Sequence, residues 1–179
     1  MILPDVNVLV YAFRREAEHH ARYAKWLAGV IAGADELALH DVVLASMARI
    51  VTNPRIFADP APMSATLDFL GRVRAARRAR WLPSGSAAWD ELDQLTRQDR
   101  GIRGNLVPDA HLAALALAHG CRIATADRGF ARFPGLTCFD PAAPHDAIGR
   151  LGAIQGRTAL GPDSATAEDL VREDRERSR

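Results

Sequence analysis

Three aspartates stand at positions where a fold of short strands and helices would bring carboxylates together. Asp5 follows an apolar N-terminal run, Asp109 falls in the first turn of an expected helix, and Asp127 lies just past the run 122–125. The carboxyl ends of parallel strands meet at one edge of a sheet, where ligands bind. Clustered carboxylates raise one another's pKa values, which favours a bound cation. Hard oxygen ligands suit Mg²⁺ or Mn²⁺, and such an ion would activate water against a phosphodiester.

Each acid also has a purely structural interpretation, and the sequence leaves these alternatives open. Asp5 is a preferred residue type for a helix N-cap. Asp41 opens the helix after the second expected strand, so it is the candidate for a fourth catalytic acid, with an N-cap role as its alternative. Asn7 and Thr125 lie beside Asp5 and Asp127 and are predicted to orient these carboxylates by hydrogen bonds.

The elements that must position these residues alternate along the chain. Apolar runs predict strands at 1–4, 36–39, 122–125 and 136–139, with a possible fifth at 81–83. Helices are expected at 7–13, 18–31, 42–51, 64–80, 86–100 and from Pro108 to Gly120. This alternation predicts an α/β fold with a parallel sheet of four to five short strands flanked by helices. We expect a nuclease-like domain over 1–140 and a linker and tail over 141–179.

Composition bounds the class of protein. A chain of 179 residues with 48% apolar and 25% charged residues is long enough to bury one globular core. The formal net charge of +1 disfavours a wholly basic nucleic-acid binder, although a local basic patch is compatible with it. Cys121 and Cys138 are expected to be reduced thiols. We find no signal peptide and no apolar run of about 18 residues, so the prediction is a cytoplasmic protein without a membrane span.

Arginines gather in two stretches that could contact phosphates. In the helix expected over 64–80, Arg74, Arg77 and Arg78 have helical spacing and would share a face. Arg103 follows the next helix, close in sequence to Asp109. We predict that these four arginines steer RNA, with a solvated helix surface as the alternative for the first group.

Four motifs carry a resemblance to a known family. They are Leu-Pro-Asp-Val-Asn-Val-Leu-Val-Tyr-Ala at 3–12, Arg-Ile-Val-Thr-Asn-Pro-Arg-Ile-Phe at 49–57, Gly-Asn-Leu-Val-Pro-Asp-Ala-His-Leu-Ala-Ala at 104–114 and Thr-Ala-Asp-Arg-Gly-Phe-Ala-Arg-Phe-Pro-Gly-Leu at 125–136. Residues 1 to about 140 thereby resemble PIN-domain ribonucleases, specifically VapC-type toxins of toxin–antitoxin modules.

The resemblance implies an endoribonuclease that needs Mg²⁺ or Mn²⁺, forms a homodimer and has a cognate antitoxin. It carries the acidic roles onto Asp5, Asp109 and Asp127. The chain departs from the family pattern at two places: many relatives have a glutamate where Ser46 or a neighbour stands, and an aspartate where Gly129 stands.

The tail differs from the rest of the chain. No aromatic residue follows Phe139, and proline and glycine punctuate the run up to 162. The stretches 148–158 and 168–177 are similar to the toxin-binding ends of antitoxins. We hypothesise that the tail docks on the domain and that Arg172 or Arg175 enters the acidic cleft; a solvated tail is the alternative. A rival interpretation is a catalytically weak module with a regulatory role, and phosphatase or DNA nuclease chemistry would use the same ligands.

Overall fold

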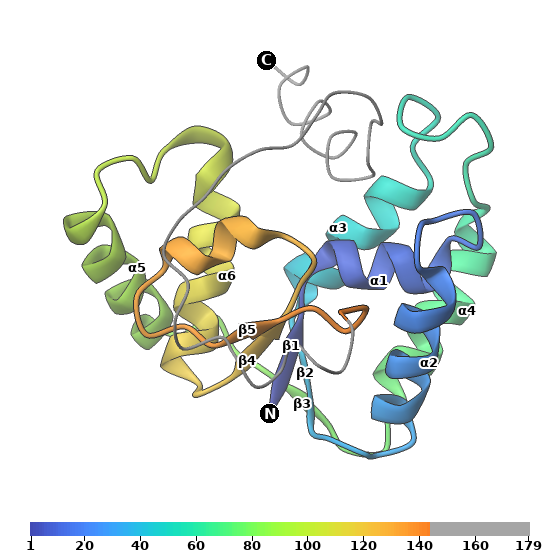
Figure 1. Ribbon diagram of the computed structural model, residues 1–179, viewed down its shortest axis with the longest axis horizontal. Helices are drawn as coiled ribbons and strands as arrows, with labels where there is room; N and C mark the ends of the chain where they lie inside the picture. The colour runs from blue at the N-terminus through green and yellow to red at the C-terminus, as the bar shows by residue number, and fades with distance from the viewer. Residues whose placement is uncertain (144–179) are drawn as a thin grey trace.

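The computed structural model describes residues 1–143, and its centre is a five-stranded parallel sheet (Figure 1). The tail predicted over 141–179, with Arg172 and Arg175, lies almost wholly outside the described residues. The strand order is β3-β2-β1-β4-β5, so the N-terminal strand is central. The strands are β1 (Ile2–Pro4), β2 (Leu37–Leu39), β3 (Ala79–Trp81), β4 (Arg122–Ala124) and β5 (Cys138–Phe139). The predicted α/β fold with a parallel sheet is therefore confirmed.

Helices cover the sheet in two groups. In the view of Figure 1, α5 and α6 lie to one side of the strands and α1, α2 and α4 to the other. The helices are α1 (Val6–Phe13), α2 (His20–Ile31), α3 (Asp41–Val51), α4 (Met63–Arg74), α5 (Ser86–Gln98) and α6 (Val107–Ala118). Two 3₁₀ turns, η1 (Gly104–Leu106) and η2 (Arg128–Arg132), flank the acidic positions.

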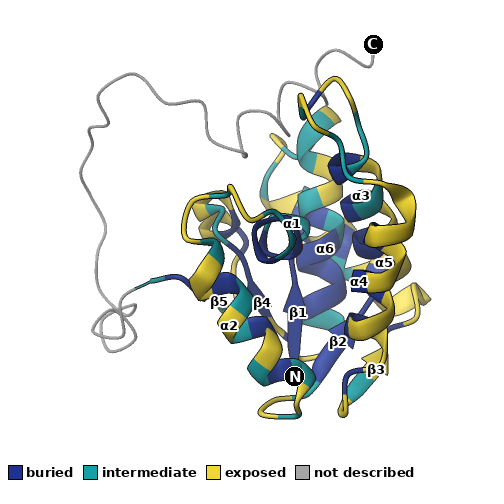
Figure 2. Ribbon diagram, turned by 90° about the vertical axis from the view of Figure 1, so that its right-hand side faces the viewer, coloured by how far each residue is buried: buried dark blue, intermediate teal, exposed yellow. Residues whose placement is uncertain are grey.

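The core lies between the sheet and its inner helices (Figure 2). All three residues of β1 and of β2 are buried, as expected for strands covered on both faces. In α6 the run from Leu112 to Ala116 is buried, in accord with its nearly continuous apolar sequence. In α5 only one stripe is inside: Leu92 and Leu95 are buried, whereas Trp89 is 58% exposed.

The helix expected over 64–80 is shorter than the sequence suggested. It ends at Arg74, because Arg77 donates its backbone N–H to Ile31 O at 2.9 Å and the chain then enters β3. The strand expected at 81–83 is correspondingly displaced to Ala79–Trp81. The prediction that Arg74, Arg77 and Arg78 share one helical face was therefore wrong.

The chain leaves the sheet beside α2. Tyr23 Oη donates a hydrogen bond to Asp140 Oδ1 at 2.9 Å, and Arg22 Nη1 donates one to Ala142 O at 2.7 Å. Ala142 is only 4% exposed, so the end of the described chain is anchored on this helix. Within residues 1–143, no helix combines the length and the apolar character that crossing a bilayer would need.

Candidate active site

Asp5 stands at the junction between the central strand and the first helix. Its backbone is extended (φ −74°, ψ 160°), and Oδ1 accepts the N–H of Val6 at 2.6 Å, so it is the N-cap of α1. Oδ2 accepts the hydroxyl of Thr125 at 2.8 Å. The side chain lies at the carboxyl end of β1, the edge at which parallel sheets bind ligands. The capping role and a place at the functional edge therefore coincide in one residue.

The environment of Asp5 opposes its ionisation. Burial, with a smaller contribution from the charges of Asp109 and Asp127, raises its pKa from 3.8 to about 7, although the hydrogen bonds from Thr125 and Val6 act in the opposite direction. Asp5 is 8% exposed, so little water is available to solvate a negative charge. A cation held beside this carboxylate would offset both the desolvation and the repulsion.

The Thr125 hydroxyl forms hydrogen bonds with Asp5, Asn7 and the backbone of Asp127. Its Oγ1 donates to Asp5 and accepts hydrogen bonds from Asn7 Nδ2 at 3.2 Å and from the backbone N–H of Asp127 at 3.0 Å. Asn7 Oδ1 in turn accepts the N–H of Ala126 at 3.4 Å. The structure thus places both predicted orienting residues, Asn7 and Thr125, between the first helix and the segment after β4.

Asp109 and Asp127 reach the same edge from different elements. Asp109 lies in the first turn of α6, where the helix dipole favours a negative charge. Asp127 follows β4 and caps η2, because its Oδ1 accepts the N–H of Gly129 at 2.6 Å. Both act on the pKa of Asp5, so the structure brings the three predicted metal ligands into one electrostatic cluster.

Asp5, Asp109 and Asp127 have the donor atoms that a divalent metal prefers, but their side chains are not grouped around one point. All three side chains offer the carboxylate oxygens that Mg²⁺ and Mn²⁺ prefer. In the described part of the chain, no three or more His, Cys, Asp or Glu side chains are grouped as a ready ligand set. Asp127 Oδ1 accepts a hydrogen bond from the N–H of Gly129, and each oxygen of Asp5 accepts one from a protein donor.

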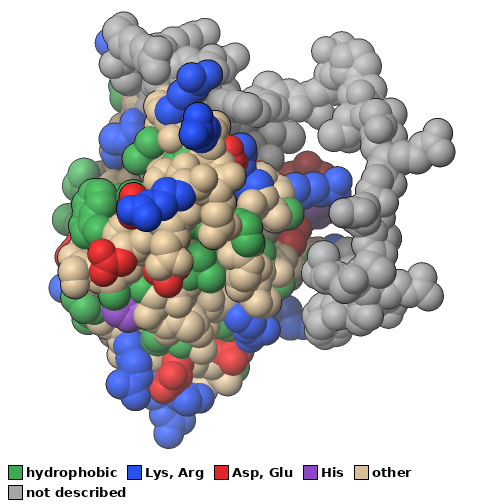
Figure 3. Space-filling model, turned by 90° about the vertical axis from the view of Figure 1, so that its left-hand side faces the viewer, with side chains coloured by type: hydrophobic (Ala, Val, Ile, Leu, Met, Phe, Trp, Pro, Cys, Tyr) green, Lys and Arg blue, Asp and Glu red, His purple; other side chains and the backbone are tan. Residues whose placement is uncertain are grey.

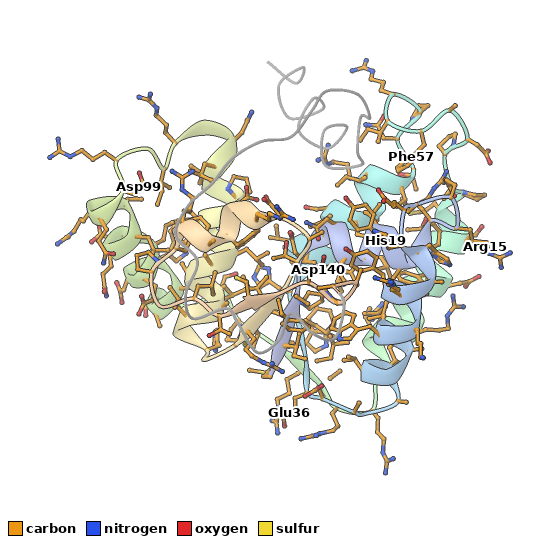
Figure 4. All side chains as sticks on the ribbon, viewed as in Figure 1. Arg15, His19, Glu36, Phe57, Asp99 and Asp140 are labelled. Atoms are coloured by element: carbon orange, nitrogen blue, oxygen red, sulfur yellow. The ribbon has the colours of Figure 1, made fainter. Side chains whose placement is uncertain are left out.

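Asp41 stands next to His40 after the end of β2, and its charge acts on the pKa of His40. It is the first residue of α3 and is exposed, and its neighbour His40, not Asp41, occupies the N-cap position. The carboxylates that act on the pKa of Asp5 are Asp109 and Asp127. Glu36 lies at the opposite edge, before β2, and pairs with Arg78 and Arg80 (Figure 4). Glu36 is therefore not a substitute for the missing fourth acid.

The predicted RNA-binding arginines divide between the two edges of the sheet. Arg77 and Arg78 precede β3, at the amino ends of the strands and away from the acidic cluster, and Arg74 ends α4. Arg103 is exposed and immediately precedes η1 and α6, the helix that carries Asp109. Of the four arginines, Arg103 is thus the one that lies next to the helix of Asp109 in the sequence.

Contacts among three rings at the end of β2, on α5 and on α6 were not predicted from the sequence. His40 is 4% exposed at the end of β2, and its Nε2 shares a hydrogen bond of 2.7 Å with Ser84 Oγ. His111 on α6 lies between the rings of His40 and Trp89. The available signal was positional: His40 directly precedes Asp41, and His111 stands two residues after Asp109.

Comparison with known proteins agrees with this fold. A family model described as PIN domain matches residues 2–136. VapC ribonuclease Mb2897 of Mycobacterium bovis is 41% identical over 136 residues, covering 76% of this chain and 92% of the relative. Ribonuclease VapC37 of Mycobacterium tuberculosis is 35% identical over 150 residues, covering 80% and 99%.

Solved structures support the same architecture at lower identity. VapBC2 from Rickettsia felis, bound to a DNA fragment from its promoter, matches with a TM-score of 0.58 and 21% identity over 78% of this chain and 98% of that chain. FitAcB from Neisseria gonorrhoeae matches with a TM-score of 0.52 and 21% identity over 79% and 98%. By the family model and the similarity to VapC ribonucleases, the chain belongs to the PIN-domain family and is of the VapC type.

Proposed function

We propose that this protein is a metal-dependent endoribonuclease toxin that acts in the cytoplasm. The observation that carries the proposal is the buried carboxylate of Asp5, with the charges of Asp109 and Asp127 acting on it at the carboxyl edge of a parallel sheet. The similarity to proteins named VapC ribonucleases supports RNA as the substrate.

In this proposal Asp5, Asp109 and Asp127 hold Mg²⁺ or Mn²⁺, which when bound supplies an activated water and stabilises charge on the scissile phosphate. Thr125 keeps Asp5 oriented and ionisable by donating to Oδ2. Asn7 fixes the Thr125 hydroxyl, so both residues act on the ligand rather than on RNA.

Arg103 is the basic residue that we assign first to the RNA backbone, because it is exposed beside the helix of Asp109. Arg74, Arg77 and Arg78 lie at the other edge, so they would contact only a longer RNA that wraps around β3. Lowering the ionic strength should strengthen binding to both groups.

The test is cleavage of structured RNA in Mg²⁺ or Mn²⁺ by the full chain and by Asp5→Asn, with DNA of the same sequence in parallel. Loss of metal-dependent RNA cleavage in Asp5→Asn, with Asp90→Asn unchanged as an exposed control on α5, supports the proposal. No metal-dependent cleavage by either the full chain or a chain lacking 145–179 would instead favour the catalytically weak, regulatory module. Cleavage of DNA alone would show a different nuclease.

A cognate antitoxin is the proposed partner, as the similarity to VapC ribonucleases and to the VapBC2 and FitAB structures suggests. A groove of about 510 Å³ between α1, α2 and α4 offers it a surface, with Leu27 and Phe69 inside and Arg15, Asp68 and Arg72 among the lining residues. An amphipathic helix suits such a groove. Ala28→Glu, which places a charge in the groove, should weaken antitoxin binding, whereas Lys25→Glu on the same helix should not.

We also propose a homodimer, by analogy with the family, which sedimentation of the purified chain tests directly. A dissociated monomer at assay concentrations that still cleaves RNA would show that the second copy is not needed. An inactive monomer would show that it is.

The segment 145–179 is proposed to mask the site, in cis or across a dimer, with Arg172 or Arg175 opposite the carboxylates. The described chain ends on α2, so about twenty residues separate this anchor from Ser164, a span that reaches across a domain of this size. Deleting 145–179 should raise RNA cleavage. Equal cleavage by the truncated and full chains would show that the tail does not mask the site.

A further inference from the structure

Three rings, those of Trp89, His111 and His40, form a continuous line from the surface to the interior. The centroids of Trp89 and His111 are 5.4 Å apart, and those of His111 and His40 are 6.0 Å apart. Trp89 is 58% exposed, whereas His40 is 4% exposed. The interplanar angle between the indole and His111 is 58°, so His111 meets the indole at an angle and leaves most of its surface open.

The inner end of this line is fixed by polar contacts. His40 Nε2 and Ser84 Oγ share a hydrogen bond of 2.7 Å, and His119 Nε2 lies 3.3 Å from Pro83 O. Both contacts hold the segment that leads into α5, and Trp89 follows in the first turns of that helix. Trp89 is therefore presented by a braced element, although its own side chain is exposed.

Two of the rings come from elements that also carry a proposed metal ligand or pair with an element that does. His111 stands two residues from Asp109 on α6, and His40 ends β2, the strand paired with β1 whose end carries Asp5. The face of the molecule that carries α5 displays hydrophobic, basic and acidic side chains (Figure 3). Arg103, just before α6, is one of the exposed arginines near this helix end.

An exposed indole next to a phosphate-cleaving site suits one class of ligand. Proteins that bind single-stranded nucleic acid combine basic residues with aromatic planes on which bases stack. Paired bases have their faces covered by neighbours, so only an unpaired base can lie on the indole. Trp81 is similarly exposed, at 48%, but lies on the edge strand β3 and has no part in the ring contacts.

We propose that Trp89, supported by His111, is a stacking subsite for an unpaired base adjoining the scissile phosphate. This inference rests on the proposed ribonuclease function, but the subsite itself is a binding surface and can be measured without cleavage.

The test is binding of a short, fluorescently labelled, single-stranded oligoribonucleotide to the full chain in EDTA, followed by anisotropy. Trp89→Ala should raise Kd about 5- to 100-fold, because one stacked base contributes that much to affinity. Trp89→Phe should recover part of this loss, and Trp81→Ala should leave Kd unchanged. A series of oligonucleotides with one abasic position each should show one position whose loss weakens binding to the wild-type chain but not to Trp89→Ala.

Several outcomes overturn the subsite: equal effects of Trp89→Ala and Trp81→Ala, an abasic effect of the same size in both chains, or no RNA binding by the full chain. A change in sedimentation of Trp89→Ala without RNA would assign this surface to a second copy, which also overturns the subsite.

The ribonuclease proposal and the subsite proposal fail separately. Binding with the predicted abasic pattern but no cleavage in Mg²⁺ or Mn²⁺ rejects the nuclease, whereas normal cleavage by Trp89→Ala rejects the subsite.

Discussion

Thr125 Oγ1 donates a hydrogen bond of 2.8 Å to Asp5 Oδ2 although 120 positions separate the two residues in the sequence. The same oxygen accepts hydrogen bonds from Asn7 Nδ2 and from the N–H of Asp127. One buried hydroxyl thereby sets the position of two of the proposed metal ligands. Its contribution can be separated from simple packing by an isosteric change.

Thr125→Val should lower metal affinity and RNA cleavage about 10- to 100-fold, the usual effect of losing a residue that orients a ligand. It should also reduce the free energy of unfolding by about 1–3 kcal/mol, because the buried Asp5 carboxylate and two partly buried groups, Asn7 Nδ2 and the N–H of Asp127, lose their partner. Calorimetric titration with Mn²⁺ and a denaturant curve measure the two effects. Thr137→Val, at an exposed position before β5, is the matched control and should change neither.

Asp5→Asn should change how stability depends on pH. The pKa of Asp5 is about 7 in the folded chain against 3.8 as its ordinary value, so between these values the folded state holds the proton more tightly than the unfolded chain. Wild-type stability therefore falls as pH rises through this window. The cost approaches an upper bound on the order of 4 kcal/mol once Asp5 ionises above pH 7.

Denaturant curves in EDTA across this pH range check the prediction. The difference in unfolding free energy between Asp5→Asn and wild type should move in favour of the variant as pH rises. Asp90→Asn, an exposed change on α5, should show no such trend. Parallel curves for wild type and Asp5→Asn would contradict the raised pKa.

Gly129→Ala should disturb Asp127 without disturbing the fold. A Cβ atom at this position would lie 2.9 Å from Asp127 Oδ1, the oxygen that accepts the Gly129 N–H. The carboxylate must shift, so we expect Mn²⁺ affinity to fall about tenfold. Gly71→Ala on α4, where no atom lies within 4 Å, should leave Mn²⁺ affinity unchanged and add about 0.5–1 kcal/mol of stability. Equal metal affinity in the two variants would show that the Gly129 turn does not orient Asp127.

Asp41→Asn and Asp109→Asn should differ in their effects on metal binding. Asp109 acts on the pKa of Asp5, whereas Asp41 is exposed at the start of α3. We expect Asp109→Asn to weaken Mn²⁺ binding more than tenfold. Loss of a metal ligand should weaken binding more than loss of a residue that only orients a ligand. Asp41→Asn should alter RNA cleavage more than metal affinity. A comparable loss of Mn²⁺ binding in Asp41→Asn would instead make Asp41 the fourth ligand.

The fold and the acidic cluster could be predicted because local patterns and general topology agree there. Short apolar runs followed at once by Asp5 and Asp127 indicate strand ends, and the Pro108–Asp109 pair indicates a helix start. Parallel pairing then brings these ends to one edge, as the pairing of β1 with β4 shows. No long-range information beyond the rule for parallel sheets was needed.

Two features could not be predicted because they depend on contacts between distant segments. The end of α4 is set by the hydrogen bond from Arg77 N to Ile31 O, so the spacing of the arginines alone suggested too long a helix. The line of His40, His111 and Trp89 joins β2, α6 and α5. Residue type alone does not separate Trp89 from Leu92 on α5, because both side chains are apolar although only Leu92 is buried.

Because β1 is the central strand and pairs with β4, the candidate site can form only late in the synthesis of the chain. The first residues of the chain form β1, yet they pair with β4, and Asp5 acquires Thr125 and Asp127 only when residues 122–127 have been made. Contacts of such large sequence separation form slowly, because loop closure precedes them. A ribosome-bound chain that ends before residue 122 therefore lacks Asp127, one of the three carboxylates of the candidate site, and it also lacks Thr125, the hydrogen-bond partner of Asp5. Cleavage can thus serve as a reporter of complete folding.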